Sequence, residues 1–198
     1  MAEPSPPLML LGRALDQTSD LIAGTHPDQA ELRTPCQSWT VQQLVDHLIS
    51  DLGNFAAGVR GEKPDWSKAA GAPGGEWVGA FASARRELDG AWSAADLDAL
   101  VPGMSGEAPL VSRADPQIAE LGIHAWDLAR ATGQSEELDP DVAEYGLRWG
   151  TANLAAQFRG PEEQGKVFGP EVQMPNDAPV YERLAGWFGR DPGWSQPG

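Results

Sequence analysis

Glu120 and His124 are the residues of this sequence whose types and spacing point most directly to chemistry. Residues four apart on an α-helix project from the same side, with their Cβ atoms about 5–6 Å apart. A carboxylate oxygen and an imidazole nitrogen at that spacing can bind one metal ion. Both residues flank an apolar stripe that contains Ile118, Leu121 and Leu128. The pair is therefore expected to face a neighbouring helix rather than bulk water.

His47 is the third candidate ligand, because it stands at the edge of another apolar stripe, beside Leu44 and Leu48. Antiparallel or diagonal packing of two helices would bring its imidazole opposite Glu120 and His124. Two neutral imidazoles and one carboxylate suit a divalent metal, with zinc as the first candidate and nickel or another first-row ion as alternatives. Such a set leaves at least one coordination position open, which is typical of catalytic sites.

Spacing alone leaves a second interpretation open. Glu-x-x-x-His pairs also occur on helices as surface charge pairs, and His47 could be a half-buried histidine bonded to a carbonyl. The remaining histidine, His26, lies in a polar turn and is expected to be an ordinary loop residue. The sequence contains no Gly-x-Ser-x-Gly elbow, Walker loop, His-Glu-x-x-His or Gly-x-Gly-x-x-Gly turn. The sequence therefore contains no motif that would indicate a common hydrolase, nucleotide-binding or dinucleotide-binding site.

Helix signals frame the elements that must position these residues. Thr40 and Gln43 have the spacing of a capping box, which predicts the start of a long helix carrying the first histidine. Asp115 is expected to be the N-cap of the helix that carries the later pair, with Pro116 in its first turn and Gly133 at its end.

Apolar spacing and flanking Gly and Pro predict further helices over residues 8–22, 77–92, 139–160 and 178–188. Gly and Pro indicate a loop over 60–75, an ordered but irregular crossover over 94–114, and an extended coil, with a short strand as the alternative, over 166–174. No alternating pattern is long enough to predict a sheet. The expected fold is all-α: a four-helix bundle with additional short helices and a long crossover segment, in one domain spanning 1–198.

Charge and composition narrow the function classes. The chain carries 29 acidic and 14 basic residues, a formal net charge of −15, so its average surface repels phosphate backbones and anionic lipids. Neither nucleic acid nor membrane is expected as a partner. No apolar run approaches the ~20 residues of a membrane span, and the N-terminus does not have the pattern of a secretion signal. Cys36 is the only cysteine, which excludes an intrachain disulfide. A cytoplasmic protein is expected.

Two stretches of the sequence resemble a known family. They are Thr34-Pro35-Cys36-x-x-Trp39-Thr40-Val41-x-x-Leu44-Val45-x-His47-Leu48 and Glu120-Leu121-Gly122-Ile123-His124-Ala125-Trp126-Asp127-Leu128-Ala129-Arg130-Ala131-Thr132-Gly133. The pattern is similar to the metal-binding domain of mycothiol-dependent maleylpyruvate isomerases, within the DinB/YfiT-like superfamily. The resemblance implies a four-helix bundle whose metal is held by a histidine of the second helix and a Glu-x-x-x-His pair, which fall on His47, Glu120 and His124. The isomerase is expected to match only in its bundle, because residues 161–198 are too few for its further C-terminal domain.

The resulting hypothesis is a metal-dependent thiol transferase or isomerase in which the metal binds the sulfur of a small cosubstrate, mycothiol for example, for attack on a small electrophile. Asp127 is expected to orient a ligand. Arg85 or Arg86 could receive a carboxylate, with an exposed, solvated role as the alternative. Cys36 precedes a helix N-terminus, where a reactive thiolate is one interpretation and quiet packing the other.

Two other function classes remain open at this stage. One is a carrier or sensor that binds metal without turnover. The other is a structural or interaction bundle in which the three residues never meet. No exposed heptad indicates an oligomer, so both a monomer and a homodimer are compatible with the sequence.

Overall fold

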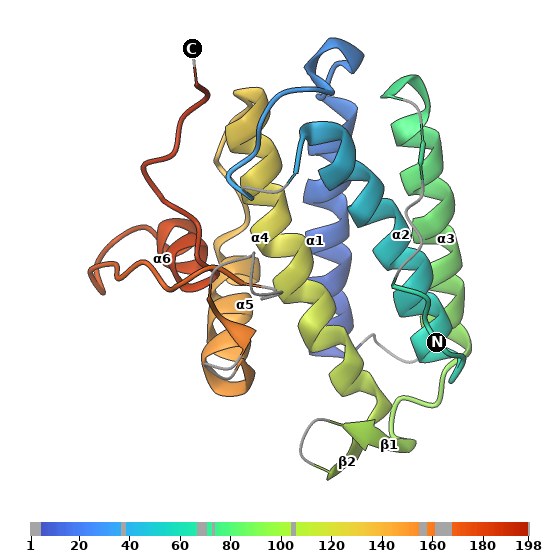
Figure 1. Cartoon of the computed structure of the whole chain (residues 1–198). Coiled ribbons are helices and arrows are strands. Elements are labelled where there is room, and N and C mark those ends of the chain that lie inside the picture. The colour runs from blue at the N-terminus through green and yellow to red at the C-terminus, as the bar shows by residue number, and fades with distance from the viewer. Residues whose placement is uncertain are drawn as a thin grey trace.

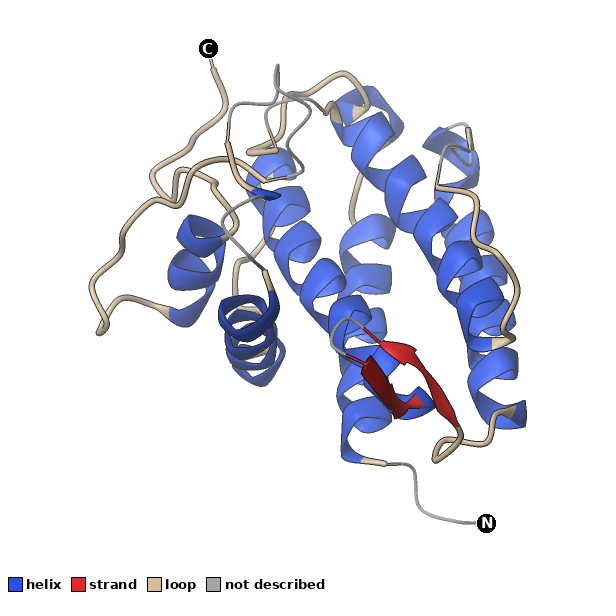
Figure 2. Ribbon diagram, turned by 60° about the horizontal axis from the view of Figure 1, so that its bottom comes forward, coloured by secondary structure: helices blue, strands red, loops and turns tan. Residues whose placement is uncertain are grey.

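The computed structural model describes residues 5–36, 39–66, 71–72, 74–103, 106–154, 158–160 and 168–197 (Figure 1). Within these ranges the chain forms the α-helices α1 (Pro6–Ala23), α2 (Val41–Val59), α3 (Trp77–Ala94), α4 (Ala114–Thr132), α5 (Pro140–Asn153) and α6 (Val180–Trp187). Two short strands, β1 (Leu100–Gly103) and β2 (Gly106–Pro109), lie near one end of the bundle (Figure 2). The prediction of an all-α bundle is confirmed.

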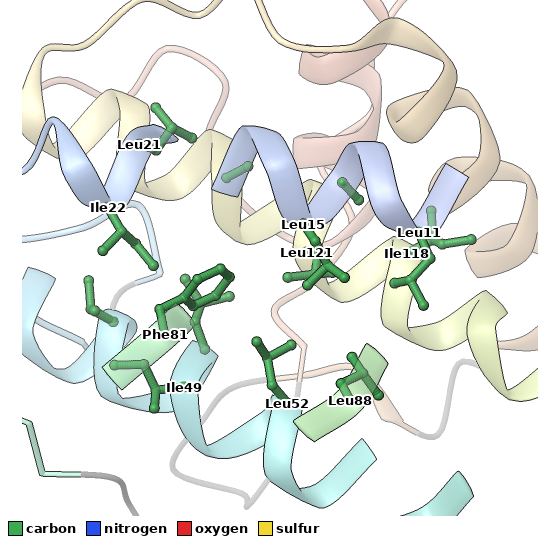
Figure 3. Packing of buried hydrophobic residues seen from close by; sticks show 14 of the residues in the cluster. Leu11, Leu15, Leu21, Ile22, Ile49, Leu52, Phe81, Leu88, Ile118 and Leu121 are labelled. Atoms are coloured by element: carbon green, nitrogen blue, oxygen red, sulfur yellow. The ribbon is translucent and has the colours of Figure 1, made fainter. Parts of the chain in front are cut away.

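The main hydrophobic core lies between the first four helices. α2 packs along α3, and α4 packs along α1. Figure 3 shows side chains of α1 and α4, among them Leu15 and Leu121, facing side chains of α2 and α3, among them Leu52 and Phe81. All four are almost completely buried, and removal of apolar surface from water is the main favourable term in folding. This core fixes α2 and α4, the helices that carry the candidate ligands.

α5 and α6 cover the other side of α4, as Figure 1 shows. A second cluster of buried side chains, including Ile123, Trp126 and Leu184, joins the three helices. A Cβ atom on Gly146 would lie 3.1 Å from the Cα atom of Ala119, so glycine at this position lets α5 approach α4 closely. α4 is consequently enclosed by other helices along most of its length.

The start of α2 agrees with the sequence prediction, whereas the start of α4 does not. The hydroxyl of Thr40 accepts a hydrogen bond from the backbone N–H of Gln43, whose side-chain oxygen accepts one from the N–H of Thr40. α4 begins at Ala114 because the 3-10 turn Leu110–Arg113 leads directly into it. Asp115 therefore lies inside the first turn, and the prediction that it is the N-cap was wrong.

The crossover between α3 and α4 also differs from the prediction. Its residues 100–103 and 106–109 pair as an antiparallel hairpin in which Val101 lies opposite Ala108. Alternation is hard to detect in strands of four residues that contain Pro102 and Pro109. Both strands are edges of a two-stranded sheet, where a proline without an N–H is tolerated. The expectation of an irregular segment was therefore wrong for this part of the crossover.

The predicted boundaries of the later helices are partly confirmed. Gly133 ends α4 in the left-handed conformation, with φ 70°, and the carboxylate of Asp139 caps α5 by accepting the N–H of Asp141. α5 ends at Asn153 rather than at Gly160. The Asn153 side chain donates to the carbonyl of Trp149 in the last turn of this helix.

The C-terminal part contains little regular structure besides α6. Residues 168–174 form no helix or extended strand, as predicted, while 161–167, which include Pro161, lie outside the described residues. Within the described part of the chain, no helix combines the length and apolar character needed to cross a membrane.

Candidate metal centre

The candidate centre lies between α2 and α4, which run antiparallel. The capping box places His47 in the second turn of α2. Glu120 and His124 occupy successive turns of α4. His124 is almost completely buried, whereas the side chains of His47 and Glu120 retain 23% and 25% exposure. The three residues therefore meet at the edge of the bundle core, with access to solvent from one side.

The structure brings all three predicted ligands together. The Nε2 atom of His47 lies 2.8 Å from Oε1 of Glu120, and Nε2 of His124 lies 3.1 Å from the same oxygen. One ligand atom from each residue lies within 4.8 Å of the others. A tetrahedral ion with bonds of about 2.0–2.2 Å spaces its ligands by about 3.3–3.6 Å. Small side-chain rotations would satisfy that geometry, and the donor set of two imidazoles and one carboxylate fits zinc or a similar ion.

Two of the three residues have strongly shifted pKa values. Burial alone would raise the pKa of Glu120, but the adjacent His124 and His47 hold it well below its usual range. Burial alone would lower the pKa of His124, but Glu120 and Asp127 raise it to about 9. Without a metal, His124 is therefore an imidazolium between two carboxylates, which is how this buried histidine satisfies both ring nitrogens.

Asp127 contacts His124 from the side opposite Glu120. Its Oδ2 atom lies 2.9 Å from Nδ1 of His124, and its side chain is fully buried. Because an ionised carboxylate only accepts hydrogen bonds, Nδ1 carries the proton and Nε2 is the nitrogen left for a metal. Burial alone would raise the pKa of Asp127, but the nearby charge of Arg190 together with His124 lowers it.

Sequence reasoning missed Asp51 and Trp39. Asp51 lies one turn beyond His47 on α2, and its Oδ2 is 3.4 Å from Nε2 of that histidine. The same four-residue spacing that identified Glu120 and His124 could have found it. Trp39 precedes the capping box. The centroid of its ring lies 4.4 Å from the ring centroid of His47 and 5.4 Å from that of His124.

The structure places Arg85 and Arg86 away from the three ligands. Arg85 forms an ion pair with Asp16 of α1 at 2.7 Å. Arg86 lines a separate hollow of about 460 Å³ beside Arg60 and the end of α3. No hydrogen bond or ion pair among the described residues joins either arginine to the three ligands, so a role for them in binding a carboxylate stays a prediction.

The two remaining candidate residues from the sequence are His26 and Cys36. His26 is exposed in the turn before residues Pro27–Gln29, and it is not among the three residues that meet at the centre. Cys36 is half-buried in the loop before α2. Cys36 also lies near Arg190. Burial alone would lower the pKa of this arginine, but Asp127 and, to a smaller extent, Cys36 raise it.

Comparison with known proteins agrees with this architecture. Residues 11–129 match the model of the family described as mycothiol maleylpyruvate isomerase N-terminal domain. Two uncharacterised proteins of Mycobacterium tuberculosis, from strains CDC 1551 / Oshkosh and H37Rv, are each 34% identical over 191 residues, covering 93% of this chain and 97% of the relative.

Solved structures share the fold. The crystal structure of the mycothiol-dependent maleylpyruvate isomerase matches with a TM-score of 0.60 at 17% identity. A mutant of that isomerase with one histidine changed to alanine matches with a TM-score of 0.62 at 16% identity. Each match covers 96% of this chain and 80% of the isomerase chain, so the structural likeness extends beyond the bundle to which the sequence resemblance had limited it. The chain belongs to the mycothiol maleylpyruvate isomerase N-terminal domain family.

Proposed function

We propose that this protein is a divalent-metal-dependent enzyme that activates a small thiol for addition to a small electrophilic substrate. The observation that carries the proposal is the convergence of His47, Glu120 and His124 on one point, with Nδ1 of His124 held by Asp127. Zinc is the first candidate ion, and nickel or another first-row ion would fit the same donors. Mycothiol is the candidate thiol, because the family and its structural relatives are described by their dependence on it.

The arrangement of the donors supports catalysis over a purely structural metal. His47 and His124 would bind through Nε2, and Glu120 would contribute one negative charge. Three protein ligands leave a tetrahedral ion with one open position, and the partial exposure of His47 and Glu120 gives that position access to solvent. When bound, the ion would favour the thiolate form of a coordinated thiol at neutral pH.

The chain's own residues have separable tasks in this proposal. Asp127 keeps the proton of His124 on Nδ1 and thereby directs Nε2 towards the open side. Trp39 packs against both imidazole rings and would shield that side of the centre from water. Attack by the thiol sulfur on an electrophilic carbon would give thiol transfer, and attack followed by loss of the thiol would give isomerisation.

Metal analysis of the purified protein tests the site. We expect about one equivalent of a first-row ion in the wild type, and its loss from His47→Ala and Glu120→Ala. His26→Ala is the matched control, because this histidine is exposed and outside the centre; it should retain the metal. A wild type that binds none of zinc, nickel, cobalt or manganese would contradict the site and leave a structural or interaction role.

A thiol-conjugation assay tests catalysis. Metal-loaded and metal-free protein are compared with mycothiol and with simple thiols, using a panel of electrophiles that includes maleylpyruvate. We expect the metal-loaded wild type to accelerate the reaction and Glu120→Ala to be inactive. Bound metal with no acceleration for any pair would favour a carrier or sensor instead.

A further inference from the structure

A buried ion pair connects the C-terminal segment to the candidate metal centre. Nη2 of Arg190 donates to Oδ2 of Asp127 at 2.9 Å, and Nε lies 3.3 Å from both carboxylate oxygens. The two side chains are 7% and 0% exposed. The Oδ2 atom that accepts from Arg190 is also the one bonded to His124. Arg190 is therefore one residue removed from a proposed metal ligand.

The backbone around Arg190 is fixed by the end of α6. Gly189 adopts the left-handed conformation with φ 78°, which suits glycine after a helix. The N–H of Arg190 then donates to the carbonyl of Ala185 at 2.9 Å, and its Nη1 donates to the carbonyl of Phe188 at 3.0 Å. The guanidinium thus reaches Asp127 from a rigid support rather than from a free tail.

The segment beyond Arg190 is attached to the same region. Arg130 donates to the carbonyl of Pro192 at 3.2 Å. Gln196 donates to the carbonyls of Ala131, in α4, and Arg33, in the loop that leads to Trp39. The segment therefore spans α4 and the loop before α2, which both supply side chains to the centre.

Removal of Arg190 would leave the Asp127 carboxylate buried with His124 as its remaining side-chain partner. A buried carboxylate that loses these donors would rotate towards others. That rotation would weaken the control that Asp127 has over the orientation of the His124 ring. Residues that orient metal-binding histidines typically change metal affinity about 10- to 100-fold when they are removed.

We propose that Arg190 is a positioning residue of the metal centre, which acts through Asp127 on His124. It lies outside residues 11–129, the part that matches the family's N-terminal domain, so that part alone would be an incomplete site. The inference rests on the proposed metal site, and it adds that the C-terminal segment belongs to this site.

The test measures Co²⁺ and Zn²⁺ affinity by chelator competition, and the visible absorption of the Co²⁺ form, which reports ligand geometry. We expect Arg190→Met to weaken both affinities about 10- to 100-fold and to change the Co²⁺ spectrum. Arg190→Lys keeps the charge but not the fork of donors, so its metal affinity should fall less than that of Arg190→Met. Arg130→Met is the matched control for general loosening of the C-terminal segment, and it should leave affinity and spectrum unchanged.

A double-mutant cycle separates positioning from folding. Arg190→Met combined with Asp127→Asn removes both buried charges, and the pair should bind metal as Asp127→Asn alone does, within threefold. Wild-type affinity and spectrum in Arg190→Met would overturn the inference while leaving the metal site intact. An equal loss in Arg130→Met would also overturn it. A wild type that binds neither ion would instead contradict the proposed function.

Discussion

The carboxylate of Asp51 lies 3.4 Å from Nε2 of His47, the same nitrogen that faces Glu120. The residue is 7% exposed, and no Arg or Lys pairs with it among the described residues. Burial raises the pKa of Asp51 to about 6, with His47 lowering it and Glu120 raising it. The charge of Asp51 is therefore costly in the metal-free protein, and a divalent ion between α2 and α4 would compensate it.

Asp51→Asn should stabilise the metal-free protein and weaken metal binding. A carboxyl group with a raised pKa in the folded state contributes its stability at low pH and loses it as the pH rises through about 6. The free energy of unfolding of the variant, measured with denaturant at pH 7.5, should therefore exceed that of the wild type by at most about 3 kcal/mol. The difference should vanish below pH 4. Metal affinity, measured by chelator competition, should fall about tenfold.

Asp46→Asn is the control for this prediction. Asp46 lies next to His47 in the sequence, but its carboxylate accepts from Gln42 and from the backbone N–H of Ala72 rather than facing the centre. It should leave metal affinity unchanged. Equal metal affinity in Asp51→Asn and wild type would show that the Asp51 charge does not act on the ion.

Metal affinity should rise with pH because the ion competes with a proton on His124. Burial opposes the charged imidazole, but Glu120 and Asp127 raise the pKa of His124 to about 9. Binding through Nε2 must displace that proton, so the apparent affinity should increase about tenfold per pH unit between pH 6.5 and 8.5. Calorimetry in buffers of different ionisation enthalpy should detect about one released proton. A pH-independent affinity over this range would contradict the assignment of His124 as a ligand.

The parts that the sequence predicted correctly depend on local signals. The capping box at Thr40, the Gly133 terminus and the spacing of Glu120 and His124 are each encoded within one helix. The packing of α2 against α4 could be anticipated only as one of several arrangements, since apolar stripes do not specify their partners. The resemblance to the family indicated the arrangement in which His47 faces Glu120 and His124.

The parts that it did not predict depend on contacts between distant segments. Arg190 reaches Asp127 across 63 residues of chain. Asp127 was expected to orient a ligand, but no local pattern marks Arg190 as its partner. Asp115 resembled an N-cap because the sequence does not reveal that the preceding 3-10 turn continues into α4. Its carboxylate instead accepts a hydrogen bond from the hydroxyl of Tyr145 at 2.7 Å.

Removal of the capping box should lower stability without affecting the metal. Thr40→Ala deletes the hydroxyl that accepts the N–H of Gln43, and such a loss typically costs about 1 kcal/mol. Denaturant unfolding of the metal-free protein measures this cost. Thr40→Ser keeps the hydroxyl and should be close to wild type, and both variants should bind metal with unchanged stoichiometry. A loss of metal from Thr40→Ala would show that the helix start also controls the position of His47.

The two imidazoles of the centre are oriented by different means, which predicts a specific role for Trp39. Asp127 holds Nδ1 of His124, whereas no hydrogen bond to a described residue holds Nδ1 of His47, whose ring packs 4.4 Å from that of Trp39. Aromatic pairs of this kind are worth about 0.5–1.5 kcal/mol, so Trp39→Ala should weaken metal affinity about 2- to 13-fold. Trp39→Phe should retain most of it. Trp66→Ala, which removes a tryptophan that is 59% exposed and packs on Phe55, is the control and should behave as wild type in chelator competition. If Trp39→Ala also matched the wild type, the contacts with Glu120 and Asp51 would suffice to orient His47.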